Sequence, residues 1–443
     1  MRQHIPIASL SSFFYTFIRN DDVSDAFISF LSSQRRGNWR EMAEKNVYRA
    51  TISSLRSSSS MDSSDASTFL NDPSKAKPAS ILFLGTGSST GCPKPLCALL
   101  QDHTDSSCFV SNLAMEGNPK YNKNYRNNPS ILISHANDDD TNNVNAENRL
   151  RSVIIDVGKT FREGALRWMP SHNKHIDAIV LTHGHADAIG GMDDVRGFQS
   201  IIKNENASNR KDKYRVQPIP VFLSDECLQV VSRQFPYLVP DESKDLTFSD
   251  SSILKDNKPV VKRHVAALNY HTIEPFEPFL AAGLKIIPLP VKHGEDMICL
   301  GFAFSLKHVN VSKRSHSFNN PTNHKESFFE NEKKVTNIVY LSDISRMLSK
   351  TESFIMEKLP PTDILIIDSL LRHRRHSTHY NLDQAIAMAR TLGAKKTYIV
   401  GMNCDDFKPH DEMNKELALL DGVSVQLAHD GLLLEFENDD EII

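Results

Sequence analysis

The sequence predicts an α/β protein in which short buried strands alternate with helices. Short apolar runs at 178–181, 284–291 and 363–367 are typical of strands that are buried on both faces. Helical spacing of apolar residues at 160–169 and 381–392 places helices between such strands. Several of these strands end in a polar residue. We therefore expect a shared edge of a β-core, where loops bring polar side chains together.

The composition is typical of a soluble globular protein. Of the 443 residues, 40% are hydrophobic and 24% are charged, and we find no apolar run long enough to cross a bilayer. The formal net charge of -4 argues against a broadly basic surface for nucleic acid, although a local basic patch remains compatible with it. Six cysteines are too few for a disulfide scaffold in so long a chain, so we expect reduced thiols or metal ligands.

The first 76 residues differ from the rest of the chain. Residues 1–20 contain arginine and serine but no acidic residue, as an organellar presequence would, whereas aspartates at 21, 22 and 25 break that pattern. A serine-rich stretch at 57–67 follows. Residues 1–76 are thus either a disordered extension of a cytoplasmic protein or a targeting segment for a mitochondrion or another organelle.

Residues 77–443 are predicted to form one domain. Polar, low-complexity insertions are expected near 137–148, 203–214 and 312–334. Towards the end of the chain, 423–427 and 432–436 are predicted to form a β-hairpin.

One motif has the residue types and the position of a metal site. His183, His185 and Asp187 lie in Leu181-Thr-His-Gly-His-Ala-Asp-Ala-Ile-Gly-Gly191, directly after a predicted strand, and a helix is expected over 192–200. Two imidazoles and a carboxylate that converge on a tight turn suit a divalent metal, with neutral histidine as the ligand.

Other candidate residues follow predicted strands farther along the chain: His293, Asp343, Asp368, His379 and Cys404. A distant histidine and a distant aspartate are what a hydrolytic site with one or two metals needs in addition to the first motif.

Three early thiols form a second candidate metal site. Cys92, Cys97 and Cys108 are close enough in sequence for a structural zinc, but a fourth ligand is absent from the local pattern. Either His103 or a residue from far along the chain would complete the site. Otherwise these cysteines are reduced thiols.

The strand-turn motif also resembles a family signature. Thr182-His-Gly-His-Ala-Asp187 resembles the HxHxDH signature of the metallo-β-lactamase superfamily, and His293 and Asp343 follow in the order of its later ligands. The resemblance covers about 80–437. Further motifs are similar to those of the PhnP-like phosphodiesterase group: Gly85-Thr-Gly87, Pro288-Leu-Pro-Val-Lys-His-Gly294 and Thr378-His-Tyr-Asn-Leu-Asp-Gln-Ala385.

The resemblance implies a four-layer αβ/βα sandwich with two mixed β-sheets and helices outside. It also implies one or two divalent ions, zinc or manganese, and assigns roles residue by residue. His183, His185 and His293 would bind the first metal, Asp343 would bridge, and Asp187 would bind the second metal. His379 would correspond to the family's histidine near the leaving group, a general acid. The alternative for His379 is a surface histidine in a basic run.

Two departures from the family pattern fall on the second metal site. The last histidine of the signature is Ala188 here, and a late histidine is replaced by Cys404. Cys404 could bind zinc as a thiolate, which would favour zinc over manganese. Alternatively the site holds one metal, or Asp405 or Asp406 substitutes.

The sequence therefore predicts a metal-dependent hydrolase, in which metal-activated water attacks a small phosphodiester. The basic run Arg372–Arg375 would face this anionic substrate. One alternative is a thioester or lactone hydrolase of the same fold. Another is a non-catalytic metal-binding protein with a degraded second site. A tRNA-processing nuclease is disfavoured because the insertions are mixed in charge, and the sequence leaves room for a homodimer.

Overall fold

The computed structural model describes residues 78–99, 109–136, 150–203, 214–239, 265–308 and 334–436. These residues belong to a compact unit, Ser74–Ile443, which is distinct from a first unit, Met1–Pro73. The predicted N-terminal extension and nearly all of the three predicted insertions lie outside the described residues. Within the described ranges, no helix combines the length and the apolar character that crossing a bilayer requires.

Two mixed sheets of seven strands each form the centre of the described part of the chain. The first sheet has the order β16 (Leu433–Phe436), β1 (Ala79–Gly85), β2 (Ser130–His135), β3 (Arg151–Ile155), β4 (Ala178–Val180), β7 (Ile219–Leu223) and β8 (Leu268–Thr272). The second has the order β15 (Val425–Leu427), β14 (Lys396–Val400), β13 (Ile364–Asp368), β12 (Val335–Leu341), β11 (Met297–Lys307), β10 (Leu284–His293) and β9 (Phe279–Ala281). A small separate ribbon pairs β5 (Ile201–Lys203) with β6 (Tyr214–Val216).

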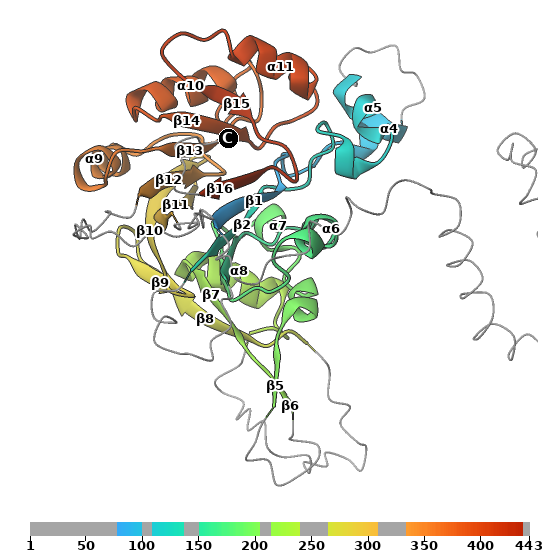
Figure 1. Ribbon diagram of the computed structural model, residues 1–443, viewed down its shortest axis with the longest axis vertical. Helices are drawn as coiled ribbons and strands as arrows, with labels where there is room; N and C mark the ends of the chain where they lie inside the picture. Colours follow the sequence, from blue (N-terminus) through green and yellow to red (C-terminus); the bar gives the residue numbers. More distant parts are fainter. Residues whose placement is uncertain are drawn as a thin grey trace, which may run out of the picture. The chain divides into compact units, whose positions relative to one another are not determined.

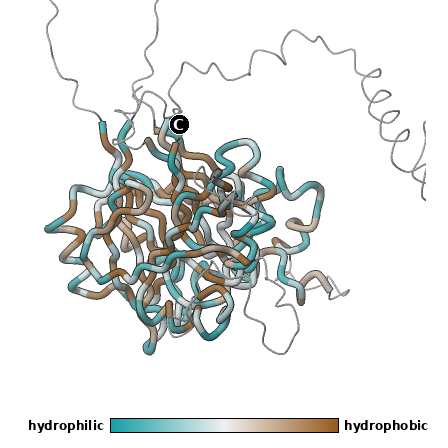
Figure 2. Tube along the Cα trace, turned by 90° about the horizontal axis from the view of Figure 1, so that it is seen from below, coloured by the Kyte–Doolittle hydropathy of each residue, from teal (hydrophilic) through white to brown (hydrophobic). Residues whose placement is uncertain are grey.

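The alternation of side chains along each strand divides the interior into three cores. In β1, Ile81 and Phe83 pack into a core between the two sheets, whereas Leu82 and Leu84 pack into a core on the outer face of the first sheet. A third core covers the outer face of the second sheet. Hydrophobic segments accordingly run through the middle of the trace in Figure 2, and hydrophilic ones gather at its periphery.

Helices cover the two outer faces of the sandwich (Figure 1). On the first sheet lie α6 (Phe161–Trp168), α7 (Ala186–Ile189) and α8 (Asp225–Gln234). On the second sheet lie α9 (Ser349–Lys358), α10 (Leu382–Thr391) and α11 (His410–Leu417). Two short helices, α4 (Pro95–Leu99) and α5 (Phe109–Met115), pack against each other. The predicted four-layer αβ/βα sandwich is confirmed.

Strand direction brings the polar strand ends together. In the first sheet β3, β4 and β7 are parallel, so their carboxyl ends share one edge. In the second sheet β12, β13 and β14 are parallel. Since β10 and β12 are both antiparallel to β11, the end of β10 lies at the same edge as theirs. This arrangement confirms the shared edge expected from the sequence.

Two local predictions are wrong. The segments at 423–427 and 432–436 do not form a hairpin, because β15 pairs with β14 in the second sheet and β16 pairs with β1 in the first. The turn between them carries the chain from one sheet to the other. The helix expected over 192–200 begins earlier as α7, and only a 3₁₀ turn, Asp194–Phe198, lies within the expected range. Glycines at 190 and 191 explain the break in the helix.

The core between the sheets should dominate stability. Phe302 is completely buried there, whereas Leu280 on the edge strand β9 is 65% exposed. We expect Phe302→Ala to lower the free energy of unfolding by about 3 to 5 kcal/mol, since it leaves a cavity. Leu280→Ala should change it by about 0.5 kcal/mol or less. Urea unfolding of both variants checks this, and equal losses would contradict the assigned core.

Candidate metal centre

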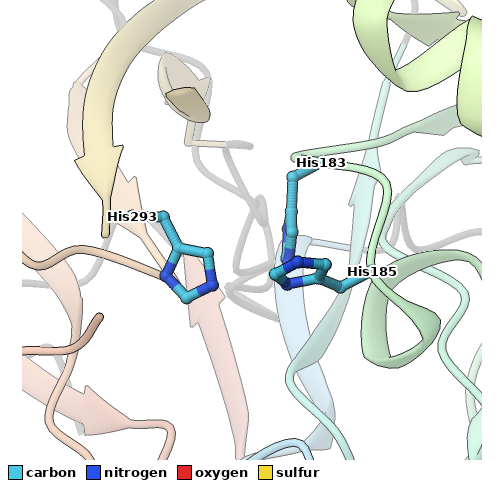
Figure 3. Close-up of side chains that lie close together, drawn as sticks. All are labelled: His183, His185 and His293. Atoms are coloured by element: carbon cyan, nitrogen blue, oxygen red, sulfur yellow. The ribbon is translucent and has the colours of Figure 1, made fainter. Parts of the chain in front are cut away.

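Three histidines face one another at the shared edge of the two sheets (Figure 3). His183 and His185 lie in the short loop between β4 and α7, and His293 is the last residue of β10. The ring centroids are 4.7 Å apart for His183 and His185, and His293 lies 5.2 Å from each of them. One ring nitrogen of each residue lies within 4.8 Å of the others. We call these three residues the histidine cluster.

A buried chain of hydrogen bonds orients His183. The Thr182 hydroxyl donates to Asp156 Oδ2 at 2.8 Å, and the Thr182 amide donates to Asp156 Oδ1 at 2.9 Å. Because the hydroxyl proton is thus used, Thr182 Oγ1 accepts from His183 Nδ1 at 2.8 Å. The proton therefore sits on Nδ1, and the lone pair of Nε2 points away from the chain of bonds. Nε2 is buried and has no hydrogen-bond partner among the described residues.

The backbone at Asp156 is shaped for this role. Its φ of 63° is in the left-handed region, which aspartate tolerates better than most residues. Burial raises the pKa of the Asp156 carboxyl well above its usual range, although both hydrogen bonds from Thr182 oppose that shift. Asp156 was not among the residues that the sequence analysis singled out.

Burial also favours neutral imidazoles at His183 and His293. It lowers the pKa of His183 well below its usual value, and the neighbouring histidines add to the effect. Burial and the nearby His379 lower the pKa of His293 to about 4, although a hydrogen bond from His293 Nδ1 to the Thr378 carbonyl at 2.8 Å opposes this. That bond leaves His293 Nε2 available. Neutral imidazoles with available Nε2 atoms are the form that binds metals.

Two carboxylates adjoin the histidine cluster. Asp187 Oδ1 lies 3.9 Å from His183 Nε2, and one oxygen each of Asp187 and Asp343 lies within 4.8 Å of a His183 nitrogen. Asp343 also forms a similar group with His293 and His379. Burial, followed by the negative charge of Asp187, raises the pKa of Asp343 well above its usual range. A cation bound there would relieve this unfavourable burial of charge.

His379 lies beside the cluster, as the sequence predicted. Its ring centroid is 4.8 Å from that of His293, and its Nδ1 bonds Asp368 Oδ2 at 2.7 Å. Burial alone would lower the pKa of His379, but the carboxylates of Asp368 and Asp343 outweigh it and raise this pKa to about 9. Gly401, with φ 76°, permits Asp368 to sit there, because a Cβ at 401 would lie 2.1 Å from Asp368 Oδ1.

The structure does not bring Cys404 to the histidine cluster, which corrects the expectation that it binds at the second metal site. Its sulfur instead lies within 4.8 Å of the Cys97 sulfur and an Asp405 oxygen. A hydrogen bond also joins Cys404 to Cys92, and this bond is the largest cause that lowers the pKa of Cys92. We call Cys92, Cys97 and Cys404 the thiol cluster. Cys404 occupies the position in the sequence where the family has a late histidine. Only the fold shows that its side chain lies beside Cys92 and Cys97 instead.

The remaining predicted residues are also located. Ala188 packs into the core on the outer face of the first sheet, so this position offers no ligand. Asp405 forms an ion pair with Lys94 at 2.8 Å, and Asp406 accepts a hydrogen bond from the Arg372 amide, so neither joins the histidine cluster. Cys108 and His103 lie outside the described residues.

The donor set fits a divalent metal at the histidine cluster. Three imidazoles with available nitrogens and a neighbouring carboxylate match the ligands that zinc binds, and the orphaned buried Nε2 of His183 lacks only a partner such as a cation. A second position beside it retains the carboxylates of Asp187 and Asp343, but neither Ala188 nor Cys404 contributes to it.

The chain is similar to several proteins of known structure. A crystal structure of a diphosphatase from the PhnP family is 29% identical, with a TM-score of 0.51 over 81% of this chain and 98% of that chain. The metallo-β-lactamase fold protein YhfI from Bacillus subtilis is 15% identical, with a TM-score of 0.45 over 81% of this chain and 99% of that one.

One curated relative matches a large part of the chain. The octanoyltransferase of Porphyromonas gingivalis is 21% identical over 322 residues, which are 73% of this chain. The chain spans 45% of the length of that relative.

A family model completes the comparison. It is described as a beta-lactamase superfamily domain and matches residues 151–402, which are more than half of the chain. This range contains the histidine cluster, Asp187, Asp343 and His379. The resemblance to the metallo-β-lactamase superfamily and its PhnP-like group, which the motifs indicated, is thereby confirmed. The chain belongs to the β-lactamase superfamily.

Proposed function

We propose that the protein is a metal-dependent hydrolase of small phosphodiesters. The observation that carries this proposal is the convergence of the histidine cluster and His379 at one edge of the sandwich. Similarity to a diphosphatase from the PhnP family supports phosphorus as the centre of reaction. When bound, a divalent ion would supply a Lewis acid that polarises the phosphoryl group and makes water more acidic.

The chain's own residues would bind the ion, orient the His379 ring and protonate the leaving group. His183, His185 and His293 would hold the ion, with Asp343 beside them as the anionic ligand. His379 would act on the leaving group. Its Nδ1 is bonded to Asp368, so its Nε2 is the nitrogen that is available to donate a proton to the departing oxygen. Asp368 would hold the ring in place and stabilise its charge.

We further propose that the site binds one ion, at the histidine cluster, and not two. A second ion would need further ligands beside Asp187 and Asp343, but Ala188 lies in a hydrophobic core and Cys404 lies in the thiol cluster. A thioester or lactone hydrolase would use the same residues on a carbonyl carbon. His379 favours an oxygen leaving group over the thiolate of a thioester, because an alkoxide gains more from a proton donor. The similarity to a diphosphatase favours the phosphodiester over a lactone.

Loss of one cluster histidine should remove the metal and the activity together. We expect His185→Ala to lose the ion of the histidine cluster. Its turnover of bis(4-nitrophenyl) phosphate should fall by more than the about 10- to 100-fold that loss of an outer-shell partner costs. Elemental analysis and nitrophenol release measure both. His175→Ala removes an exposed histidine outside the site and serves as the control. Unchanged turnover in His185→Ala with zinc and with manganese would refute the proposal.

The hydrogen-bond chain behind His183 should tune metal affinity. Thr182→Val keeps the volume of the side chain but removes the hydroxyl that joins Asp156 to His183. We expect metal to bind about 10- to 100-fold more weakly, as measured by competition with a chelating dye. Thr351→Val removes an equally buried hydroxyl that bonds the Pro290 carbonyl and should leave the affinity unchanged. Equal affinity in the two variants would show that this chain does not orient His183.

We also propose that the thiol cluster holds a structural zinc, with Cys97, Cys404 and Asp405 as ligands. The buried guanidinium of Arg126 supports this proposal. None of its nitrogens has a hydrogen-bond partner among the described residues, and the nearby charges that raise its pKa against burial include Cys92 and Cys404. The hydrogen bond with Cys404 and the charge of Arg126 lower the pKa of Cys92, whereas the hydrogen bond with Cys92 and burial raise the pKa of Cys404. Thiolate is the form that binds zinc, and a bound ion would favour it at Cys404.

The two proposed ions should be separable by mutation. Cys404→Ser should lose about one zinc ion per chain and, since a structural zinc contributes folding energy, should lower the melting temperature. It should retain the ion that His185→Ala loses. Cys227→Ala, which changes a buried thiol in another core, is the control. Full zinc content in Cys404→Ser would rule out the structural site.

A further inference from the structure

A loop of five consecutive basic residues runs past the metal centre: Arg372, His373, Arg374, Arg375 and His376. It follows β13 and precedes α10, with His379 three residues beyond its end. We call residues 372–376 the basic loop. What distinguishes the members of this loop is whether each already has an acidic partner.

Three of the five side chains are paired with acids of the same chain. The pairs are Arg372 with Glu416 at 2.6 Å, His373 with Asp383 at 3.4 Å and Arg374 with Asp406 at 3.7 Å. These residues are therefore poor candidates for binding a substrate anion, since binding would have to compete with an existing partner.

Asp406, one of these acids, also holds the backbone of the basic loop, together with Asn381. Asp406 Oδ2 accepts from the Arg372 amide at 2.8 Å and from the His373 amide at 3.2 Å. The Asn381 side-chain amide donates to the His373 carbonyl at 2.9 Å. These hydrogen bonds fix the backbone at the start of the basic loop, and Arg375 and His376 follow this fixed segment.

His376 lies beside His379 and has a ring donor without an acceptor among the described residues. Its Nδ1 accepts from the Thr378 amide at 3.3 Å, so this nitrogen carries no proton and Nε2 carries it. No described residue accepts from Nε2. The ring centroid lies 5.5 Å from that of His379. Thr378 links His376 to His293, because its amide donates to His376 Nδ1 and its carbonyl accepts from His293 Nδ1.

Arg375 is the neighbouring positive charge. Its side chain is exposed and has no acidic partner among the described residues, in contrast with the two arginines before it. Arg375 directly precedes His376, whose ring lies 5.5 Å from that of His379, so the two residues bring a guanidinium and a ring N–H to this end of the basic loop.

We propose that Arg375 and His376 form an anion subsite on the leaving-group side of the metal centre. This inference rests on the proposed phosphodiesterase function and narrows its substrate class to diesters whose leaving group carries its own negative charge, as a carboxylate or a phosphate. The three paired basic residues position the loop, and the two unpaired ones bind the anion. Charge-assisted hydrogen bonds from both are stronger than neutral ones, and Arg375 can bind bidentately.

The test compares leaving groups. The value of kcat/KM is measured for bis(4-nitrophenyl) phosphate, for its 3-carboxy derivative and for the corresponding 3-phosphono derivative. The wild-type protein should prefer the charged diesters, and Arg375→Ala and His376→Gln should each lower the ratio of charged to neutral rates by about 10- to 100-fold. The carboxylate and phosphonate arms show which anion the subsite prefers. Arg162→Ala and His175→Gln, which change an exposed arginine and an exposed histidine elsewhere, should keep the wild-type ratio.

A binding measurement separates this inference from the proposed function. Calorimetry should detect binding of 5-hydroxy-2-nitrobenzoate, the charged phenol, to the metal-loaded wild-type protein. The same measurement should detect no binding to Arg375→Ala or His376→Gln. If no diester is cleaved but this binding pattern holds, the subsite stands and the hydrolase proposal fails. If diesters are cleaved with the same ratio in wild type and both variants, the subsite is refuted and the hydrolase proposal stands. Failure to bind the charged phenol also refutes the subsite.

Discussion

The metal centre depends on the packing of two sheets against each other. His183 and His185 belong to a loop of the first sheet, whereas His293 and Asp343 belong to the second, so neither sheet alone contains the site. Side chains from both sheets fill the core between them, and this packing sets the distance between the two sets of ligands. A disturbance of that core would therefore act on metal affinity as well as on stability. The polar residues gather at one edge because the strands that carry them run in the same direction.

Three buried carboxylates and their partners determine how the side chains of the site are arranged. Asp156, Asp343 and Asp368 are fully buried, and burial raises the pKa of each of these carboxyls. Each is satisfied differently. Asp156 accepts two hydrogen bonds from Thr182, Asp368 pairs with His379, and Asp343 lies among the histidines. Asp343 is thus the carboxylate with most to gain from a bound cation.

Much of this arrangement could be predicted from the sequence because it depends on local patterns. Strand ends, the spacing of His183, His185 and Asp187, and the cap of α10 at Asn381 are all set by neighbouring residues. The partner of Cys404 could not be predicted, because only the fold places it next to Cys92 and Cys97. The same holds for the segment at 423–436. Two strands joined by a turn look like a hairpin, yet here they complete different sheets. Asp156 and Thr378 were missed because they act through another residue.

The number and place of bound ions test the central claim most directly. Crystals of the protein loaded with zinc would show the ions by anomalous diffraction at the zinc edge. A single peak about 2.0–2.1 Å from one ring nitrogen of each residue of the histidine cluster, with any other peak confined to the thiol cluster, is the predicted result. Two peaks about 3.5–4 Å apart that share Asp343 would contradict it, because they would show a complete second site despite Ala188 and Cys404.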